Sequence, residues 1–331
     1  MFRYIVSIGI VVMLTGCAAG GSVAPNALVP TGSQFVAGTH ADFSSPCNGS
    51  SLLRTEYRAR GISPNQALVG LFVADDTDDD VCVLQNGTWK DLGFIYESIG
   101  LPNGNWVDDK GNFFQTNTAG ANVTEYGRNQ TSPKFTYNGF ADPVVVTSDT
   151  NGNVFVGDDN FGKNGSVTQF KDGNNAPVQR CSLPGGVEGV AVDSNGDVFV
   201  AYNTSNTQGE LARFAGGLAG CKPSALSVTL GAPGGLVLDR HHNLIVADQT
   251  NHVVDVIAPP YSDVGKSFHL NLFQPYRLAL NRKENWLFVC EAPHQYVDVL
   301  EYPSGKLLIA LSQRYGFSGP RGVTDEPNAV F

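Results

Sequence analysis

Charged residues, catalytic motifs and long apolar segments are all scarce in this chain. Only 16% of the 331 residues are charged, and 21 Lys and Arg are outnumbered by 31 Asp and Glu, for a net charge of −10. A surface of this sign repels phosphate backbones, which argues against nucleic acid as a partner. The sequence also lacks a Gly-x-Ser-x-Gly elbow and a phosphate-binding loop, so no motif predicts nucleophilic or phosphoryl-transfer chemistry.

Histidine is scarce too, and its six copies form no catalytic or metal-binding pattern. The pair His241-His242 falls in an expected turn, with no third ligand at a zinc spacing. The remaining histidines show no triad arrangement; they are His40, His252, His269 and His294. The sequence therefore predicts no catalytic residue, no metal site and no cofactor.

The apolar run near the N-terminus is too short to span a bilayer comfortably. Arg3 precedes an apolar segment from Tyr4 to Leu14, and Leu-Thr-Gly-Cys follows at residues 14–17. This order resembles the lipobox of bacterial lipoproteins, where the signal peptide is cleaved before the Cys and that Cys is lipidated. The resemblance implies lipidation of Cys17 and an extracytoplasmic protein anchored to the bacterial membrane, the outer one in a Gram-negative cell. The alternative is an ordinary secretory signal with Cys17 present by chance.

Three segments follow from this interpretation. Residues 1–16 form the signal peptide. Residues 17–45 begin with the lipidated Cys and continue as a stretch rich in Gly, Ala, Ser and Pro, which is typical of a flexible tether. Residues 46–331 form the folded domain, in which 46–66 fit either an outer loop or a first strand.

A phrase that begins with two apolar residues, most often Phe-Val, recurs through the folded domain. Its copies begin at Phe72, Phe113, Phe155, Phe199, Ile245 and Phe288, at intervals of 41 to 46 residues. In the clearest copy, the turn Asp193-Ser-Asn-Gly196 separates two apolar stretches. Turns of this kind join antiparallel strands, and a strand-rich repeat of this length is typical of a β-propeller blade.

The copies resemble NHL repeats. The resemblance lies in Val246-Ala-Asp248, in Val73-Ala-Asp75 and in the segment from Gly189 to Gly196, and it extends over residues 68–331. It implies an all-β propeller of four-stranded antiparallel blades. It implies little about function, because propellers support many unrelated activities.

The two ends of the repeat array complement each other. The first copy opens at Leu71 with no inner strand before it, and the last, residues 320–331, stops where its second strand begins. We therefore predict six blades, the first completed by the C-terminus, which removes exposed sheet edges. Seven blades is the alternative, if residues 36–66 contain a degenerate copy.

In a propeller, the start of each inner strand and the loop after each second strand reach one face around the central channel. Alignment on Asp193 places Asn103, Val144, Glu188, Gly234, Tyr276 and Arg321 at the first position. The second position gives Asp75, Thr116, Asp158, Tyr202, Asp248 and Glu291. From these we select Asn103, Glu188, Tyr276, Arg321, Asp158 and Asp248 as the candidate binding face.

The channel residues fit two functions. Leu101-Pro-Asn103-Gly104 and Glu188-Gly189 resemble segments of regucalcin-type gluconolactonases, which hold a divalent cation with a Glu, Asn side chains and an Asp. Val144 and Gly234 depart from that pattern because they offer no ligand atom, and Arg321 would oppose a cation.

The favoured prediction is a non-catalytic scaffold, monomeric, that binds an envelope protein or glycan through its exposed loops. In that case Glu188 pairs with Arg321 or Arg277 across the channel mouth. A lyase resembling the streptogramin-inactivating propellers is a further alternative, but the sequence shows no distinct His/Glu pair for it.

The acidic residues after the second strands have a structural interpretation. Asp75 and Asp248 end Val-Ala-Asp phrases, where an Asp usually accepts hydrogen bonds from loop amides. The run from Asp75 to Asp80 resembles a calcium loop in charge but lacks the terminal Glu of an EF-hand. We expect a solvated acidic turn there.

Five cysteines follow Cys17: Cys47, Cys82, Cys181, Cys221 and Cys290. An extracytoplasmic location permits disulfides, and an odd count leaves at least one free thiol. Cys181 and Cys221 lie in the outer parts of consecutive repeats, so we rank this pair first.

Overall fold

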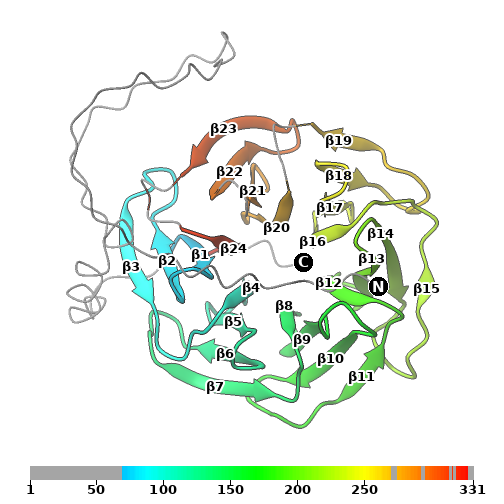
Figure 1. Ribbon diagram of the computed structural model, residues 1–331, viewed down its shortest axis with the longest axis horizontal. Coiled ribbons are helices and arrows are strands. Elements are labelled where there is room, and N and C mark those ends of the chain that lie inside the picture. Colours follow the sequence, from blue (N-terminus) through cyan, green and yellow to red (C-terminus); the bar gives the residue numbers. More distant parts are fainter. Residues whose placement is uncertain (1–68, 270–273, 292–294, 313–314, 316–317, 327–331) are drawn as a thin grey trace, which may run out of the picture. The chain divides into compact units, whose positions relative to one another are not determined.

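The computed structural model describes residues 69–269, 274–291, 295–312, 315 and 318–326. Every regular element in these ranges is a β-strand, and the strands form six antiparallel sheets of four. The sheets are arranged as blades around a central axis (Figure 1). The predicted fold class, an all-β propeller with six blades, is confirmed.

The strands of each blade follow one another from the axis outward. Blade A consists of β24 (Pro320–Asp325), β1 (Leu71–Asp75), β2 (Asp80–Leu84) and β3 (Asp91–Ile95). Blade B consists of β4 (Pro102–Val107), β5 (Phe113–Asn117), β6 (Asn122–Tyr126) and β7 (Pro133–Asn138). Blade C consists of β8 (Pro143–Ser148), β9 (Asn153–Asp158), β10 (Ser166–Lys171) and β11 (Gln179–Ser182).

The other three blades repeat this order. Blade D consists of β12 (Gly186–Val192), β13 (Val198–Ser205), β14 (Gln208–Phe214) and β15 (Ser224–Ala225). Blade E consists of β16 (Pro233–Leu238), β17 (Leu244–Asp248), β18 (Val253–Ile257) and β19 (Lys266–Phe268). Blade F consists of β20 (Pro275–Leu280), β21 (Trp286–Glu291), β22 (Tyr296–Glu301) and β23 (Lys306–Leu311).

The ring closes through blade A. Its innermost strand, β24, comes from the C-terminal end of the chain and pairs antiparallel with β1, with Val323 opposite Val73. Strand β24 also contacts β20 of blade F and β4 of blade B. Six blades therefore complete the circle without a seventh, and residues 36–66, proposed as its alternative source, lie outside the described residues.

The hydrophobic core is divided into six clusters, one at each interface between neighbouring blades. Each contains residues from the facing sides of two sheets; Phe72 of blade A, for example, stacks on Phe113 of blade B with ring centroids 4.8 Å apart. Because each sheet packs on both of its sides, the strands are apolar at consecutive positions, as the sequence of Leu71–Ala74 shows.

Blade B breaks this apolar pattern at one register position. Asn105 of β4 lies opposite Gln115 of β5. The same place in the other blades is held by aliphatic pairs: Val146 and Val156, Val190 and Val200, Leu236 and Val246, Leu278 and Val289, and Val323 and Val73. Both polar atoms of the buried Asn105 side chain, and Oε1 of Gln115, have no hydrogen-bond partner. Such atoms cost free energy in a core.

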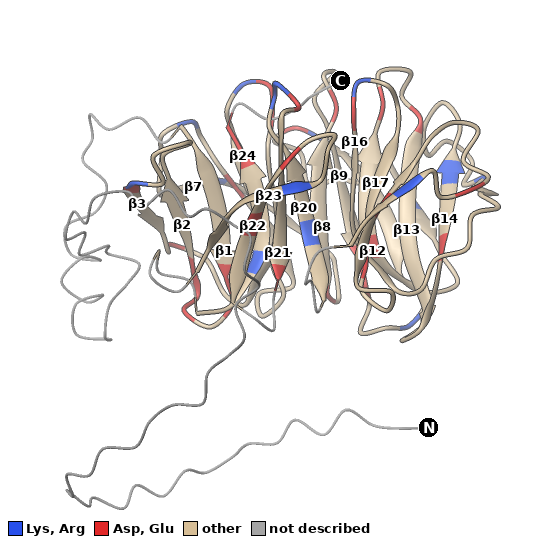
Figure 2. Cartoon of the chain, turned by 90° about the horizontal axis from the view of Figure 1, so that it is seen from above, with Lys and Arg blue, Asp and Glu red and all other residues tan. Residues whose placement is uncertain are grey.

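The strands run between two faces of the propeller, seen from the side in Figure 2. We call the face where the inner strands begin the mouth face; it carries Asn103, Glu188, Tyr276 and Arg321. The opposite face, which we call the turn face, carries the tight turns that follow the inner strands. In those turns one side-chain oxygen accepts hydrogen bonds from two backbone amides: Asp193 Oδ1, for example, accepts from the N–H groups of Asn195 and Asp197, both at 2.9 Å.

Candidate functional site at the channel mouth

Every inner strand is irregular at its first residues. Val144 of blade C, Glu188 of blade D and Arg321 of blade A each stand outside the strand register as a single extra residue. In the other three blades the irregularity covers two residues, 103–104, 234–235 and 276–277. A bulge bends a strand and redirects its side chains. All six predicted channel residues fall within these bulges, which places them around the channel mouth.

The centre of this face is narrow because neighbouring inner strands approach closely. A Cβ atom added at Gly322 of blade A would lie 2.0 Å from the carbonyl oxygen of Asn103 in blade B. One added at Gly104 would lie 2.5 Å from the carbonyl oxygen of Val144 in blade C. Only glycine allows such contacts, so these two residues let the strands come together.

Arg277, which the sequence predicts only as a possible partner for Glu188, lies at the centre of the mouth. It is 3% exposed. Its Nε donates to Asn103 Oδ1 at 3.1 Å, Nη2 donates to Glu188 Oε2 at 3.0 Å, and Nη1 donates to the backbone oxygens of Glu188 and Gly234 at 2.6 and 3.0 Å. One guanidinium thereby joins four blades, F, B, D and E.

Tyr276 stacks beside the same guanidinium. The Arg277 carbon Cζ lies 4.1 Å from the centre of the Tyr276 ring, and that of Arg321 lies 5.5 Å away. The Tyr276 hydroxyl accepts hydrogen bonds from Arg277 Nη2 at 3.1 Å and from Asn103 Nδ2 at 3.2 Å. Burial raises the pKa of Tyr276, so the phenol stays neutral and contributes packing and cation–π attraction.

Arg321 does not pair with Glu188. Its Nε donates to Asp76 Oδ2 at 2.5 Å, in the loop after β1 of its own blade. Of the two partners expected for Glu188, Arg277 is the one found. The two remaining channel residues offer no functional side chain: Val144 is buried in the core between blades C and D, and Gly234 contributes its backbone oxygen to Arg277.

Several carboxylates lie near the Arg277 guanidinium. Burial raises the pKa of Glu188 to about 7; the Arg277 charge opposes the rise, and the charges of Asp159 and Asp142 add to it. Burial also raises the pKa values of Asp142 and Asp159. Neither Asp142 nor Asp159 is in the predicted set, because the prediction took one residue at each position and these two lie within two residues of those it took.

Asp158 and Asp248 were predicted to belong to the binding face, but their carboxylates bond to backbone amides of the protein itself. Asp158 accepts hydrogen bonds from the backbone amides of residues 141, 142 and 160 at 2.8 to 3.1 Å. Asp248 accepts from the amides of Gly231 and Asn251 at 2.6 and 3.0 Å. They are 5% and 0% exposed, so neither carboxylate reaches a partner. Both carboxylates are buried and accept hydrogen bonds from loop amides. This is the structural role that the sequence predicted for Asp248.

One residue of the second predicted set is shifted by a position. In blade B the counterpart of Asp158 is Asn117, which lies opposite Pro102 as Asp158 lies opposite Pro143. The alignment selected Thr116 because it matched Phe113 with Phe155. The register instead matches Phe113 with Val154, since each lies opposite the last residue of its inner strand.

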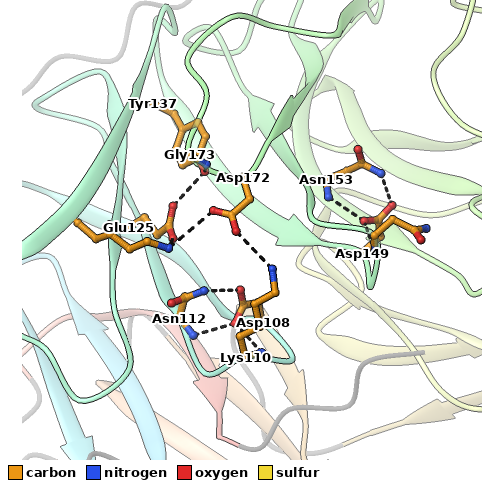
Figure 3. A network of polar contacts seen from close by, with 11 residues as sticks. Asp108, Lys110, Asn112, Glu125, Tyr137, Asp149, Asn153, Asp172 and Gly173 are labelled. Carbon is orange, nitrogen blue, oxygen red and sulfur yellow. Dashed lines mark hydrogen bonds and ion pairs between the residues drawn. The ribbon is translucent and has the colours of Figure 1, made fainter.

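The turn face carries a network between blades B and C that the sequence did not predict (Figure 3). Asp172 of blade C is 3.4 Å from Lys110 Nζ and 3.8 Å from Lys134 Nζ, both in blade B. Lys134 also contacts the buried Glu125 at 2.5 Å, and Tyr137 donates to that carboxylate at 3.0 Å. These bonds hold two blades together.

His242 and the cysteines have structural roles. His242, in the turn after β16, has Nδ1 3.2 Å from Asp193 Oδ2 of blade D. Cys181 and Cys221, the pair ranked first from the sequence, form a disulfide with Cα atoms 5.3 Å apart. Cys82 is disulfide-bonded as well, and Cys290 is a buried free thiol.

Neither a metal cluster nor a membrane-spanning helix is found in the described residues. No group of three or more His, Cys, Asp or Glu side chains there is placed to hold a metal ion. No helix within the same ranges has the length and apolar character needed to cross a bilayer.

Comparison with known proteins identifies the fold. No family model matches the chain, and neither does any curated protein. Among solved structures, a chain of the nidogen/laminin complex aligns with a TM-score of 0.61 at 15% identity, over 77% of this chain and 97% of that one. A protein of unknown function from Bacteroides caccae aligns with the same score and coverage at 10% identity. At such identities the likeness shows the fold alone: this chain is a β-propeller protein.

A virginiamycin B lyase from Staphylococcus aureus aligns less well. Its TM-score is 0.48 at 15% identity, over 64% of this chain and 69% of that one. A likeness at this level carries no argument about activity.

Proposed function

We propose that this chain is an NHL-repeat-like propeller that acts as a non-catalytic binding scaffold in the bacterial cell envelope. The observation that carries the proposal is the position of Arg277. Its guanidinium bonds to Asn103 Oδ1 and Glu188 Oε2, the two side chains that would be the best oxygen ligands for a divalent cation. A fixed internal cation therefore uses the atoms that a catalytic ion would need.

Electrostatics strengthens this argument. A divalent ion at Glu188 would stand beside the guanidinium that is 3.0 Å from the same carboxylate. Two like charges a few ångströms apart in a buried site repel strongly. Binding of a metal would require Arg277 to give up its hydrogen bonds to three other blades, B, D and E, so a lactonase of the gluconolactonase type is disfavoured.

Thermal unfolding with and without divalent ions tests this assignment. We expect the melting temperature of the parent and of Glu188→Gln to be equally insensitive to added calcium, magnesium or zinc, because Arg277 already occupies the Glu188 carboxylate. Neither protein should hydrolyse a lactone substrate. A metal-dependent rise in melting temperature that disappears in Glu188→Gln would overturn the proposal and make the lactonase the leading function.

The envelope location rests on the sequence of residues 1–17, which lie outside the described residues. We propose that residues 1–16 are a signal peptide, that Cys17 carries the lipid anchor, and that residues 18–45 are the tether. The protein would then act as a monomer that presents the propeller to an envelope protein or glycan. Cys17→Ser should release the protein from membranes or block its processing; a variant that still partitions with lipid like the parent would contradict the anchor.

A further inference from the structure

Two large apolar side chains stand exposed on the mouth face, in loops of neighbouring blades. Phe161, between β9 and β10 of blade C, is 64% exposed, and Leu101, just before β4 of blade B, is 48% exposed. Exposed side chains of this size are costly to hydrate. When a partner covers them they become the strongest contacts of an interface, aromatic ones above all.

The loop that presents Phe161 is long and is stabilised by its own hydrogen bonds. It covers residues 159–165, whereas the equivalent loops of blades A, B and E have four residues each, 76–79, 118–121 and 249–252. Asp159 Oδ2 accepts from the N–H of Gly162 at 2.7 Å, and Asn160 Nδ2 donates to the backbone oxygen of Asn164 at 2.9 Å. An ordered loop presents an aromatic anchor at little cost in entropy on binding.

A chain of contacts connects the two apolar residues. The N–H of Thr118 donates to the backbone oxygen of Leu101 at 3.2 Å, and the Thr118 side chain lowers the pKa of Asp142 against the larger rise caused by burial, so it lies beside that carboxylate. The N–H of Asp159 donates in turn to the backbone oxygen of Asp142 at 2.9 Å. Asp142 and Asp159 therefore lie in the contact path between Leu101 and the Phe161 loop.

The charge beside these residues is negative. Asp142, Asp159 and Glu188 interact with one another and share the single guanidinium of Arg277. That guanidinium is buried and already bonded to Asn103, Glu188 and Gly234. Lys163 of the Phe161 loop is the other cation of this loop region, so the carboxylates remain in excess.

From these contacts we infer that the mouth face over blades B and C binds a protein segment in which Lys or Arg residues flank an apolar side chain. We call this surface, made of Leu101, Phe161, Asp142 and Asp159, the B–C surface. The apolar anchors supply the buried area, and the carboxylates select and steer a cationic partner. The inference rests on the proposed binding function and adds the chemistry of the partner.

A short synthetic peptide of alternating Lys and Leu is the probe, measured by calorimetry with the full chain. Peptides of alternating Lys and Ser, and of Glu and Leu, separate charge from apolar contact. Phe161 and Leu101 have positive φ values of 57° and 44°, so each is replaced by Asn, which tolerates that conformation. Val178→Asn is the matched control, because Val178 is 53% exposed between β10 and β11, away from the B–C surface.

The Lys–Leu peptide should bind the parent, and Phe161→Asn should weaken it about tenfold, the usual effect of losing an aromatic anchor. The double change Asp142→Asn with Asp159→Asn should weaken it and flatten its dependence on salt. Val178→Asn should bind like the parent. Absence of binding to the parent, equal binding of the Lys–Ser peptide, or equal loss in Val178→Asn would each overturn the inference. None of these outcomes depends on added metal or on lactone hydrolysis, so the scaffold assignment is judged separately.

Discussion

Arg277 Nη2 lies 3.0 Å from Glu188 Oε2 and joins blade F to blade D across the channel. The two side chains are 4% and 15% exposed, so this ion pair is shielded from water. Removal of one partner from a buried pair leaves the other charge uncompensated, at a cost of about 3–5 kcal/mol. The pair therefore controls how firmly the blades are held around the axis.

Arg277→Met should lower the free energy of unfolding by about 3–5 kcal/mol, because the buried Glu188 must then either hold a charge without its cation or take up a proton. Denaturant unfolding at pH 8 measures the effect. Addition of Glu188→Gln to this variant should recover part of the loss, since the uncompensated carboxylate is then gone. A double variant no more stable than Arg277→Met would show that the ion pair itself contributes little.

Asn105→Val should stabilise the protein by about 1–3 kcal/mol, since it removes two buried polar atoms that have no partner. Val is also the residue at this place in blades A, C and D. Gln115→Val is the matched comparison: it removes an amide whose Nε2 donates to Asn103, Gly104 and Thr116, so it should gain less or destabilise. Thermal unfolding of both variants decides, and a loss of stability in Asn105→Val would contradict the prediction.

Asp298 should make stability fall as pH rises. Burial, aided by the charge of Glu291, raises its pKa from 3.8 to about 7. Between about pH 4 and pH 7 the folded protein therefore holds a proton that the unfolded chain has released. The stability that Asp298 contributes is fully present below about pH 4 and is lost as the pH rises through 7. Asp298→Asn should match the parent near pH 4 and be more stable at pH 8, by about 1.4 kcal/mol for each unit by which the pKa is raised.

Denaturant unfolding across this pH range tests the prediction for Asp298. The control is Asp109→Asn, which changes an exposed carboxylate in the turn after β4. It should leave the pH profile unchanged. A profile of Asp298→Asn that runs parallel to that of the parent would contradict the raised pKa.

Deletion of residues 320–331 should remove β24 and open the ring. Blade A would keep three strands, and β1 would expose the edge that pairs with β24. Unpaired edges promote association between chains, so we expect loss of soluble monomer in size-exclusion chromatography. Deletion of 327–331 alone leaves β24 intact and serves as the control. A monomeric, equally stable protein after the longer deletion would disprove closure by the C-terminus.

The sequence by itself determined the architecture. The repeated apolar pairs and Asp/Asn/Gly turns predict four-stranded blades because such strands and turns are local features. The complementary ends at Leu71 and Pro320 predict six-fold closure, since a blade without an inner strand needs one from elsewhere. Asp75 and Asp248 could be interpreted as acceptors for loop amides because an Asp after a strand accepts from the amides that follow it, as Asp75 does from Thr77 and Asp78.

Only the tertiary structure decided what stands in the channel. Arg277 and Glu188 are 89 residues apart, and Arg277 binds partly to backbone oxygens, which have no signature in a sequence. The bulges that direct these side chains also escape prediction, because an extra residue in one strand is visible only against its partner. The surface around Phe161 and Leu101 exists because the ring brings blades B and C together.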